Sequence, residues 1–518
     1  MSGKTWALIG ALSVGFLSVT PFAEASGNGS RLVDAVRNRD AAAVRALLNE
    51  HFDVNATAPD GSTGIHWAVE LDDLDIAGSL IRAGANVNAA NAFGIMPLSL
   101  ACTNASEPMV AALLKAGADP NAPLPTGETP LMTAVATGNI EAVKTLVNNG
   151  AKIDARESSR GQTALMWAAA DRKAAIVQIL LAHGADIHAR SEGGFTALLF
   201  SARGGDLTTT KSLLAAGADA NETATNGTTP LTAAIAAGHT AVARYLLDQG
   251  ANVNPKGGAS SPLQLAVSVA SVERAEKLDF VKVLLTRGAD PNARAEKISM
   301  GRGLSPLRVV PNDSPPFLIA ARNADVELMQ LLVAHGADPK GTTSLGVTPL
   351  MAAAGFDQYA IGVPQSKALA AVKLCLELGD DVNAASANGE TALHGATFRQ
   401  NEDSVEIVQY LVDHGAKVNV MDARGWTPLT IAEGLGFENR NTANKPSADL
   451  LRKLGGIPSP PDYDRNTGLA FEEISFPPGM EPQGSSPNIK PALPGIATWK
   501  PPVMPDLSAT RVNSFEDE

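Results

Sequence analysis

The chain has 518 residues, a formal net charge of -13 and only 4% aromatic residues. No block of lysine and arginine interrupts this acidity. Because phosphate backbones are bound by clustered basic side chains, we do not expect nucleic acid as a partner.

The first 25 residues have the pattern of a secretory signal. Lys4 supplies the positive start, Trp6 to Val19 the apolar segment, and Ala23-Glu24-Ala25 a small-x-small cleavage site. The apolar run is shorter than the roughly 20 residues that a bilayer span needs, and no later segment is long and apolar enough to be one. No cysteine follows the run and no twin arginine precedes it, which argues against a lipid anchor and favours the general export route. We therefore predict cleavage after Ala25 and a periplasmic or secreted protein, with an uncleaved N-terminal anchor as the alternative.

Residues Arg31 to Ala56 predict an opening half-repeat of two short helices. Charged residues on one side give the half-repeat a polar outer face, which a terminal repeat needs to stay soluble. The apolar positions are Leu32, Ala35, Val36, Val44, Leu47 and Leu48, and the charged ones are Arg37, Arg39, Asp40 and Arg45.

One complete unit runs from Gly127 to Ala151. Thr129 can cap a helix, because its hydroxyl accepts a free backbone N–H of the first turn. Pro130 suits the first helical position, where a missing N–H costs nothing. Gly150 can end the unit's second helix by adopting positive φ. The apolar stripes of the two helices are Leu131, Ala134 and Val135, then Ile140, Val143, Leu146 and Val147.

This unit resembles the ankyrin repeat, with its Thr-Pro-Leu-His-x-Ala opening, second helix and Gly-Ala-Asp turn. The turn glycine returns, at first every 33 or 34 residues, at Gly84, Gly117, Gly150, Gly184, Gly217, Gly250, Gly288, Gly336, Gly379, Gly415 and Gly455. The opening motif returns as Thr163-Ala164-Leu165, Thr196-Ala197-Leu198, Thr229-Pro230-Leu231, Ser261-Pro262-Leu263, Thr348-Pro349-Leu350, Thr391-Ala392-Leu393 and Thr427-Pro428-Leu429. The resemblance covers roughly residues 31–456, over four-fifths of the chain. It implies an all-α solenoid of about eleven to twelve helix pairs that looks most like exported bacterial ankyrin proteins, although Met132, Met166 and Met351 replace the motif histidine.

The period lengthens after Asn254, because extra residues appear near 271–276, 294–314, 356–366, 399–402 and 437–445. Insertions in solenoids map to loops on a face, which is often the binding face. Surface loops are also thermodynamically cheap to lengthen, so functional loops and neutral drift both stay open. The 294–314 insertion carries Arg294, Lys297, Arg302 and Arg308 in an acidic protein. We favour a finger that contacts an acidic partner over a loop that folds back on neighbouring repeats.

Residues 457–518 differ in character, since proline becomes frequent and helical periodicity stops. Such a composition predicts an extended or disordered tail. A structureless spacer is one interpretation. A segment that lies along the solenoid or docks on another protein is the other.

Catalytic and metal-binding patterns are missing from the sequence. No histidines have zinc-site spacing, no Cys-x-x-Cys exists, and neither a phosphate-binding glycine loop nor a Gly-x-Ser-x-Gly elbow appears. The two cysteines, Cys102 and Cys375, lie seven repeats apart, about 70 Å at roughly 10 Å per repeat, so we expect no disulfide between them. His66 and His394 occupy the motif histidine, whose family role is a bond to backbone in the adjoining turn. We expect no enzyme, no cofactor and no metal.

With catalytic and metal sites not expected, the remaining candidate for a functional site is a protein-binding surface. In ankyrin proteins the finger turns and first helices line a concave groove in which partners bind. Aromatic side chains fall at the corresponding register positions, and exposed aromatics are typical of binding hot spots. The partner-binding residues that we predict are Trp67, Phe93, Trp167, Phe195, Phe200, Phe398 and Trp426, with Arg302 and Arg308 from the basic insertion. Packing between neighbouring repeats is the alternative for this set.

The sequence thus predicts a monomeric, non-enzymatic protein–protein interaction scaffold outside the cytoplasm. The partner would bind the groove and the long loops of repeats 8–12. An alternative of another class is an accessory subunit of an exported, periplasmic enzyme complex, attached through its Pro-rich tail.

Overall fold

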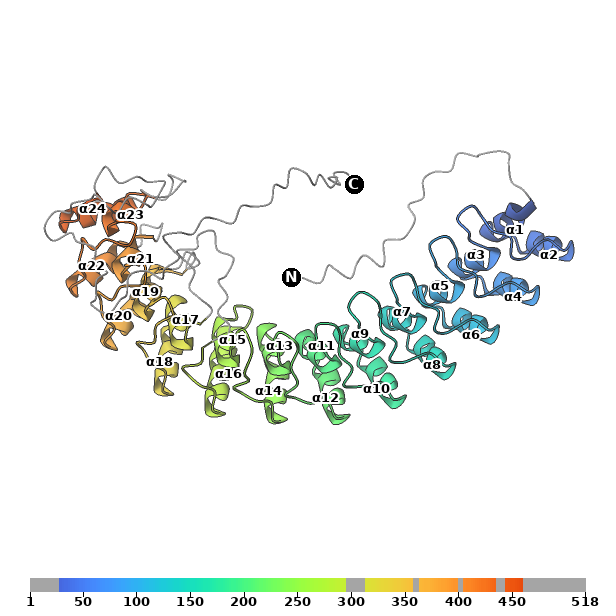
Figure 1. The fold of residues 1–518 in the computed structure, drawn as a ribbon, viewed down its shortest axis with the longest axis horizontal. Coiled ribbons are helices and arrows are strands. Elements are labelled where there is room, and N and C mark those ends of the chain that lie inside the picture. The colour runs from blue at the N-terminus through green and yellow to red at the C-terminus, as the bar shows by residue number, and fades with distance from the viewer. Residues whose placement is uncertain (1–27, 295–312, 357–362, 399–403, 435–442, 460–518) are drawn as a thin grey trace, which may run out of the picture. The chain divides into compact units, whose positions relative to one another are not determined.

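The structure is a computed structural model that describes residues 28–294, 313–356, 363–398, 404–434 and 443–459 (Figure 1). Twenty-four α-helices make up its regular structure, and the described residues contain no strand, only one bridge between Thr57 and Thr63. These helices form twelve pairs, which confirms the predicted all-α ankyrin-repeat solenoid. The predicted signal and the residues after Ser459 lie outside the described ranges.

The described residues divide into two compact units, one within residues 1–219 and the other within residues 220–518. The helices of unit 1 are α1 (Asn28–Arg37), α2 (Ala41–Asn49), α3 (Gly64–Glu70), α4 (Leu74–Arg82), α5 (Pro97–Thr103), α6 (Glu107–Lys115), α7 (Pro130–Thr137), α8 (Ile140–Asn148), α9 (Ala164–Ala170), α10 (Ala174–Ala182), α11 (Ala197–Gly204) and α12 (Leu207–Ala215).

The helices of unit 2 are α13 (Pro230–Ala236), α14 (Thr240–Asp248), α15 (Pro262–Ser268), α16 (Arg274–Thr286), α17 (Pro316–Arg322), α18 (Val326–Ala334), α19 (Pro349–Ala354), α20 (Gln365–Glu377), α21 (Ala392–Phe398), α22 (Val405–Asp413), α23 (Pro428–Ala432) and α24 (Lys445–Lys453). Within each unit the odd-numbered helices pack against one another in one layer, and even-numbered helices form the second layer.

Local sequence signals explain where the helices begin and end. The Thr129 hydroxyl accepts a hydrogen bond from the Met132 N–H at 3.4 Å, and Pro130 takes the first helical position of α7. After α8 the chain reverses at Gly150, which has a φ of 87°. That left-handed conformation suits glycine because it has no Cβ.

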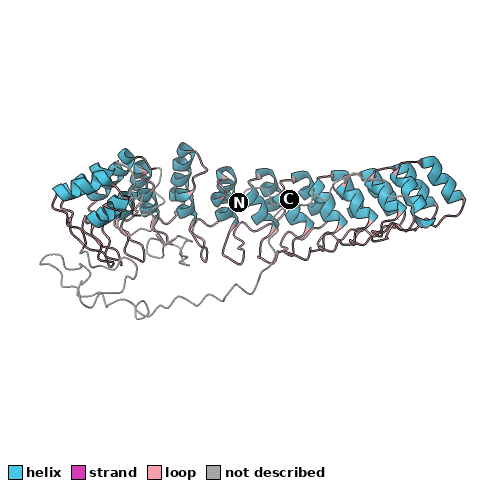
Figure 2. Ribbon diagram, turned by 90° about the horizontal axis from the view of Figure 1, so that it is seen from above, coloured by secondary structure: helices cyan, strands magenta, loops and turns pink. Residues whose placement is uncertain are grey.

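Where the connection between two helix pairs is described, it is a loop, the finger, and Figure 2 shows these loops along one edge of the helix layers within each unit. Asparagine side chains tie the base of one finger to the next. The Asn88 Nδ2 donates to the Gly117 carbonyl at 2.9 Å, and its Oδ1 accepts from the Asp119 N–H at 2.8 Å. The same two bonds recur at Asn55, Asn121, Asn221, Asn254, Asn292, Asn383 and Asn419.

This asparagine ladder is interrupted where the register position holds another residue. Asp154 accepts from the Asp186 N–H at 2.9 Å, but a carboxylate has no N–H to give to the next turn. His188 and Lys340 hold the same position in later fingers. These steps of the stack therefore lack the paired asparagine bonds of their neighbours.

The core of unit 1 is a row of leucines that repeats from pair to pair. Leu80, Leu113, Leu146, Leu180 and Leu213 are each 0% exposed. Burying such a side chain stabilises a fold by roughly 1.5–3 kcal/mol, and here each one is buried against adjoining helix pairs. Continuity of the stack therefore substitutes for a single large core.

Both cysteines are free and buried, as predicted. Burial raises the pKa of the Cys102 thiol to about 12 and also raises that of Cys375. Neither thiol is therefore ionised near neutral pH, and both act as small apolar residues.

Candidate partner-binding surface

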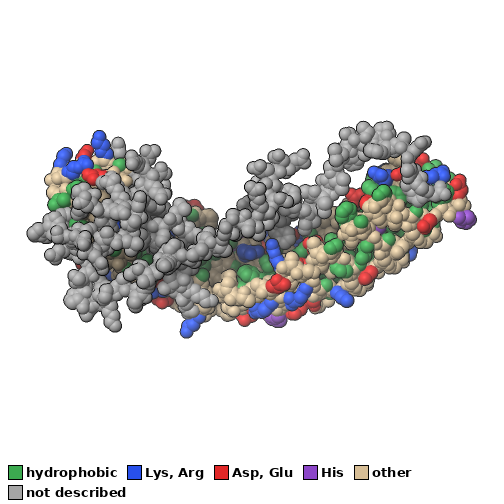
Figure 3. All heavy atoms as spheres, turned by 45° about the horizontal axis from the view of Figure 1, so that its top comes forward, with side chains coloured by type: hydrophobic (Ala, Val, Ile, Leu, Met, Phe, Trp, Pro, Cys, Tyr) green, Lys and Arg blue, Asp and Glu red, His purple; other side chains and the backbone are tan. Residues whose placement is uncertain are grey.

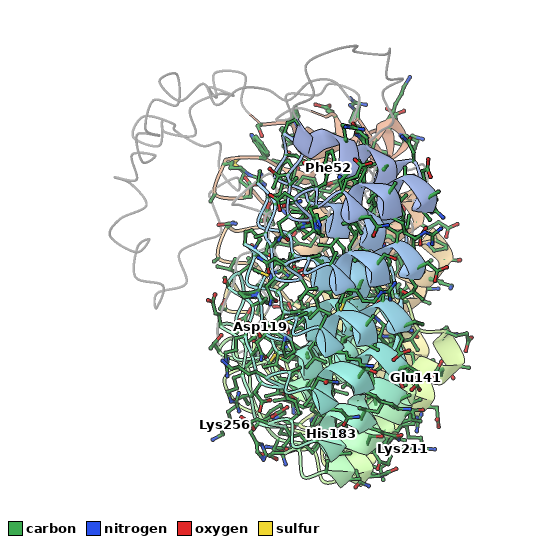
Figure 4. All side chains as sticks on the ribbon, turned by 90° about the vertical axis from the view of Figure 1, so that its right-hand side faces the viewer. Phe52, Asp119, Glu141, His183, Lys211 and Lys256 are labelled. Atoms are coloured by element: carbon green, nitrogen blue, oxygen red, sulfur yellow. The ribbon has the colours of Figure 1, made fainter. Side chains whose placement is uncertain are left out.

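We define the finger face of unit 1 as the finger loops 53–62, 86–95, 119–128, 152–162 and 186–195 together with the exposed side chains of the odd-numbered helices. Figure 4 places Asp119, at the base of a finger, on the opposite side of the molecule from Glu141 and Lys211 of the even-numbered helices. Hydrophobic side chains are exposed at several points along unit 1 in Figure 3.

Phe93 is the outstanding exposed residue of this face. Its side chain is 67% exposed at a fingertip, against 42% for Leu74 and 36% for Ile140 on even-numbered helices. Pro125 of the next finger lies beside the following residue, Gly94, where a Cβ would be 2.7 Å from the proline Cγ. The predicted site residue Phe93 therefore lies in solvent, next to a second apolar fingertip.

A backbone hydrogen bond links several neighbouring fingertips. The Ala92 N–H donates to the Asp60 carbonyl at 2.8 Å, and the Glu192 N–H donates to the Arg160 carbonyl at 2.8 Å. In the third finger the donor position is Pro125, which has no N–H. The Phe93 carbonyl oxygen therefore lacks the finger-to-finger bond that its counterparts Asp60 and Arg160 accept.

Trp67 occupies the fifth motif position of α3 and is half-buried. The guanidinium carbon of Arg37 lies 4.6 Å from the centre of its ring, and the indole N–H has no hydrogen-bond partner among the described residues. Trp167, at the same position of α9, is only 5% exposed. Because it is so deeply buried, Trp167 fits the alternative role of packing between neighbouring repeats better than the predicted role of binding a partner.

Phe195, Phe200 and Arg203 form a cluster on the finger face. The two phenylalanine rings lie 5.7 Å apart, centre to centre, at an interplanar angle of 43°. The Arg203 guanidinium lies 5.2 Å from the Phe200 ring centre and 5.8 Å from that of Phe195. Phe200 is 7% exposed, Phe195 is half-buried and Arg203 is exposed.

Trp426 of unit 2 is half-buried and is held by a buried ion cluster. The Arg424 guanidinium lies 4.1 Å from its ring centre and pairs with two carboxylates, Glu390 at 2.5 Å and Asp422 through Nε at 2.7 Å. Glu390 and Asp422 are each 1% exposed. Phe398, at the end of α21, is half-buried, and Arg302 and Arg308 lie outside the described residues.

The two motif histidines have the predicted structural role. In His394, Nδ1 accepts from the Thr391 N–H at 3.1 Å, and Nε2 lies 3.2 Å from the Trp426 carbonyl oxygen, to which it donates. His66 repeats the pattern with Thr63 and the Ile95 carbonyl. Burial lowers the pKa of His394 to about 4 and also lowers that of His66, so both are neutral near pH 7.

A family model described as "Ankyrin repeats (3 copies)" matches residues 32–124, 122–191, 198–295 and 358–440, more than half of the chain. The chain belongs to the ankyrin repeat family.

Similar proteins share repeats rather than whole chains with this ankyrin repeat protein. Potassium channel AKT1 of Arabidopsis thaliana is 44% identical over 61 residues, 12% of this chain and 7% of the channel. Putative ankyrin repeat protein FPV031 of Fowlpox virus (strain NVSL) is 33% identical over 167 residues, 31% of this chain and 42% of its own. The solved ankyrin repeat domain of Bcl-3 has 30% identity and a TM-score of 0.37, and covers 39% of this chain and 92% of its own. The matches span well under two thirds of either curated relative.

The described residues of this ankyrin repeat protein contain no group of three His, Cys, Asp or Glu side chains arranged to hold a metal ion, and none of their helices has the length and apolarity of a membrane span. A hollow of about 140 Å³ lies between two fingers of unit 2, beside Lys256, Asp290 and Arg294. Pockets for drug-sized ligands usually hold roughly 300–1,000 Å³, so this hollow is small.

Proposed function

We propose that this ankyrin repeat protein is a non-enzymatic scaffold whose protein partner docks on the finger face. The observation that carries the proposal is the 67% exposure of Phe93, the most exposed of the large hydrophobic side chains of the described residues. Aromatic side chains that become buried on association supply much of the energy of protein interfaces. A fingertip phenylalanine that is mostly exposed in the unbound protein is therefore a natural anchor.

The surroundings of Phe93 support the same function. Pro123 and Pro125 are exposed on the next finger, and Leu124 between them is half-buried. Proline side chains lose no rotamer freedom on burial, so an apolar fingertip built from them is preorganised for binding. The Phe93 carbonyl oxygen, left without a finger-to-finger bond by Pro125, can accept an N–H from a partner's backbone.

Matched serine substitutions test the proposal. Phe93→Ser removes the exposed ring from the finger face, and Leu74→Ser removes an exposed leucine from α4, on an even-numbered helix. We expect Phe93→Ser to lower recovery of the partner from native extract at least tenfold in a quantitative pull-down, and Leu74→Ser to leave recovery within twofold of wild type. Equal recovery of the partner with both variants would show that Phe93 does not contribute to the interface.

Action outside the cytoplasm remains part of the proposal and is supported by the sequence of residues 1–25. An exported bacterial ankyrin protein would have its signal removed after Ala25, so the mature chain would begin at Ser26. N-terminal sequencing of the protein recovered from an exporting host tests this directly. A chain that keeps Met1 and stays with the cytoplasmic fraction would overturn it.

A contribution from the long loops of repeats 8–12 also remains proposed, because most of those residues lie outside the described ranges. The alternative, attachment through the Pro-rich tail, has one observation in its favour. Ile457 accepts a bond from the Thr427 hydroxyl at 2.8 Å, and the Ser459 N–H donates to the Thr430 hydroxyl at 2.7 Å. The chain therefore leaves the last repeat beside the start of α23, on the finger side.

A truncation separates the two candidates. A chain that ends at Gly456 keeps all twelve helix pairs and removes the tail. If it still captures the partner and Phe93→Ser does not, the finger face is the binding site. Loss of every partner on truncation would favour the accessory-subunit alternative.

A further inference from the structure

We infer that Arg203, Phe195 and Phe200 form a binding site for a carboxylate that lies beside an apolar side chain of a protein partner. The inference rests on the proposed scaffold function and deepens it by naming the chemistry of the partner: an acidic residue next to a leucine, isoleucine or phenylalanine. Nothing in the family resemblance assigns such a site to these residues.

The geometry holds the Arg203 guanidinium in place before any partner arrives. Two rings support it, at 5.2 Å and 5.8 Å from their centres, and the rings contact each other at 5.7 Å. Phe200 is fixed by burial in α11, and Phe195 is the last residue of its finger. A guanidinium that stacks on a ring through its flat face can keep its N–H edges free, and these edges can bind a carboxylate through two parallel hydrogen bonds.

Arg203 differs in its charge partners from three other stacked arginines, and shares with Arg31, which lies over Phe52, the lack of an ion pair among the described residues. Arg37, Arg244 and Arg424 each lie over an aromatic ring and each pair with a carboxylate of the chain. Arg203 is exposed, and no described carboxylate forms an ion pair with it. Asp206, the acid closest in sequence, caps α12 by accepting from the Thr208 N–H at 3.0 Å and from the Thr209 hydroxyl.

The neighbouring surface leaves room for a partner at this cation. The preceding odd-numbered helix, α9, has the sequence ALMWAAA and carries no charged residue. Ala136 and Ala170, at the register position of Arg203 in α7 and α9, are small and half-buried. Arg203 is thus the only charged side chain on α9 and α11, in a chain whose net charge is -13.

A carboxylate fits this site better than a nucleic-acid phosphate does. Phosphate backbones are bound by several clustered cations, and the cluster offers one. The half-buried Phe195 ring, 5.8 Å from the guanidinium, favours an occupant with apolar surface next to its charge. A protein segment that carries Asp or Glu beside a large apolar residue satisfies both requirements.

Selection from a phage library of random 12-residue peptides against the immobilised full-length protein tests the site. We expect the enriched peptides to carry Asp or Glu within two residues of Leu, Ile or Phe. Arg203→Gln should raise the Kd of a synthetic copy of an enriched peptide about tenfold or more, the range expected for a charge-assisted bidentate pair. Raising the salt concentration should weaken binding to wild type more than binding to Arg203→Gln.

Arg31→Gln is the matched control, because Arg31 is an exposed arginine over one ring, Phe52 at 5.1 Å. It should leave the Kd within twofold of wild type, and Arg203→Lys should recover only part of the lost affinity. Circular dichroism and the melting temperature must match wild type in all three variants. If Arg203→Gln unfolds, Phe195→Leu takes its place in the Kd measurement, with the same loss of affinity expected.

Three results would overturn the inference: enriched peptides without an acidic residue, a Kd unchanged by Arg203→Gln, or displacement of the peptide by a 12-nucleotide single-stranded DNA at equal concentration. Failure here is distinguishable from failure of the scaffold function. If Phe93→Ser abolishes capture of the native partner while Arg203→Gln leaves the Kd of the peptide unchanged, the finger face is still the binding surface and the carboxylate site is rejected.

Discussion

Replacing Arg424 with glutamine removes the cation from the buried cluster under Trp426. Glu390 and Asp422 are each 1% exposed, and Arg424 contacts Glu390 at 2.5 Å and Asp422 at 2.7 Å. Glutamine fills part of the space but carries no charge. Both carboxylates would then remain buried without their compensating charge.

The magnitude follows from this geometry. Breaking a buried ion pair by removing one partner costs about 3–5 kcal/mol. Two features place this site near the lower end of that range. The Arg424 side chain is 17% exposed, and Asp422 keeps bonds from the N–H groups of residues 424 and 426, each at 2.9 Å. We expect Arg424→Gln to destabilise the last repeats of unit 2 by about 3 kcal/mol.

Hydrogen–deuterium exchange is the suitable assay, because repeat stacks can unfold in parts. Peptides that cover the fingers 381–390 and 417–426 should lose protection in Arg424→Gln, and the urea midpoint of unit 2 should fall. Arg452→Gln is the matched control. Its pairs with Glu433 and Asp449 are more exposed, with Arg452 at 51%, so its loss should cost less than about 1 kcal/mol. Equal protection of the two fingers in both variants would refute the reasoning.

Three further predictions concern His394, Asp154 and Cys102. Burial lowers the pKa of His394 from 6.5 to about 4. Between these two pH values the unfolded chain binds a proton that the folded chain does not. The free energy of unfolding of unit 2 should therefore fall by up to roughly 3 kcal/mol as the pH drops from 6.5 to 4. An acid titration followed by circular dichroism checks this, and His394→Gln should flatten that part of the curve, whereas equal slopes would contradict it. Asp154→Asn keeps the bond from the Asp186 N–H and adds a donor for the Gly184 carbonyl. The free energy of unfolding, measured in urea, should rise by about 1 kcal/mol. An unchanged urea midpoint would show that the asparagine bonds between fingers do not stabilise the stack. Cys102, whose pKa is raised to about 12, should react with a thiol reagent at pH 8 only as fast as its helix pair opens, and reaction within the mixing time would show that it is accessible.

The helix pairs could be predicted from the sequence because their signals are local. Thr129, Pro130 and Gly150 mark the start and end of helices within a few residues of one another, and the structure uses each of them as expected. The asparagine ladder was missed, although its signal was present. An Asn two residues after an Asp or Asn follows most turn glycines, as in Asp119-Pro120-Asn121.

The candidate surface was harder to predict because exposure depends on the neighbouring repeats. Trp67 and Trp167 share one register position, yet the first is half-buried and the second is 5% exposed. Arg203 was missed because the motif describes residue types, whereas its role depends on two rings beside it and on the absence of charge from α9. The pair of Arg424 with Glu390, which lie 34 residues apart, required the juxtaposition of two fingers.

Site-specific photo-crosslinking tests the central claim most directly. A benzoylphenylalanine placed at 93 or 195 samples the finger face, and the same residue at 74 or 140 samples exposed apolar positions on even-numbered helices. Binding through the finger face predicts covalent adducts with one partner protein from positions 93 and 195, and none from 74 and 140. Adducts that form only from 74 and 140 would contradict it.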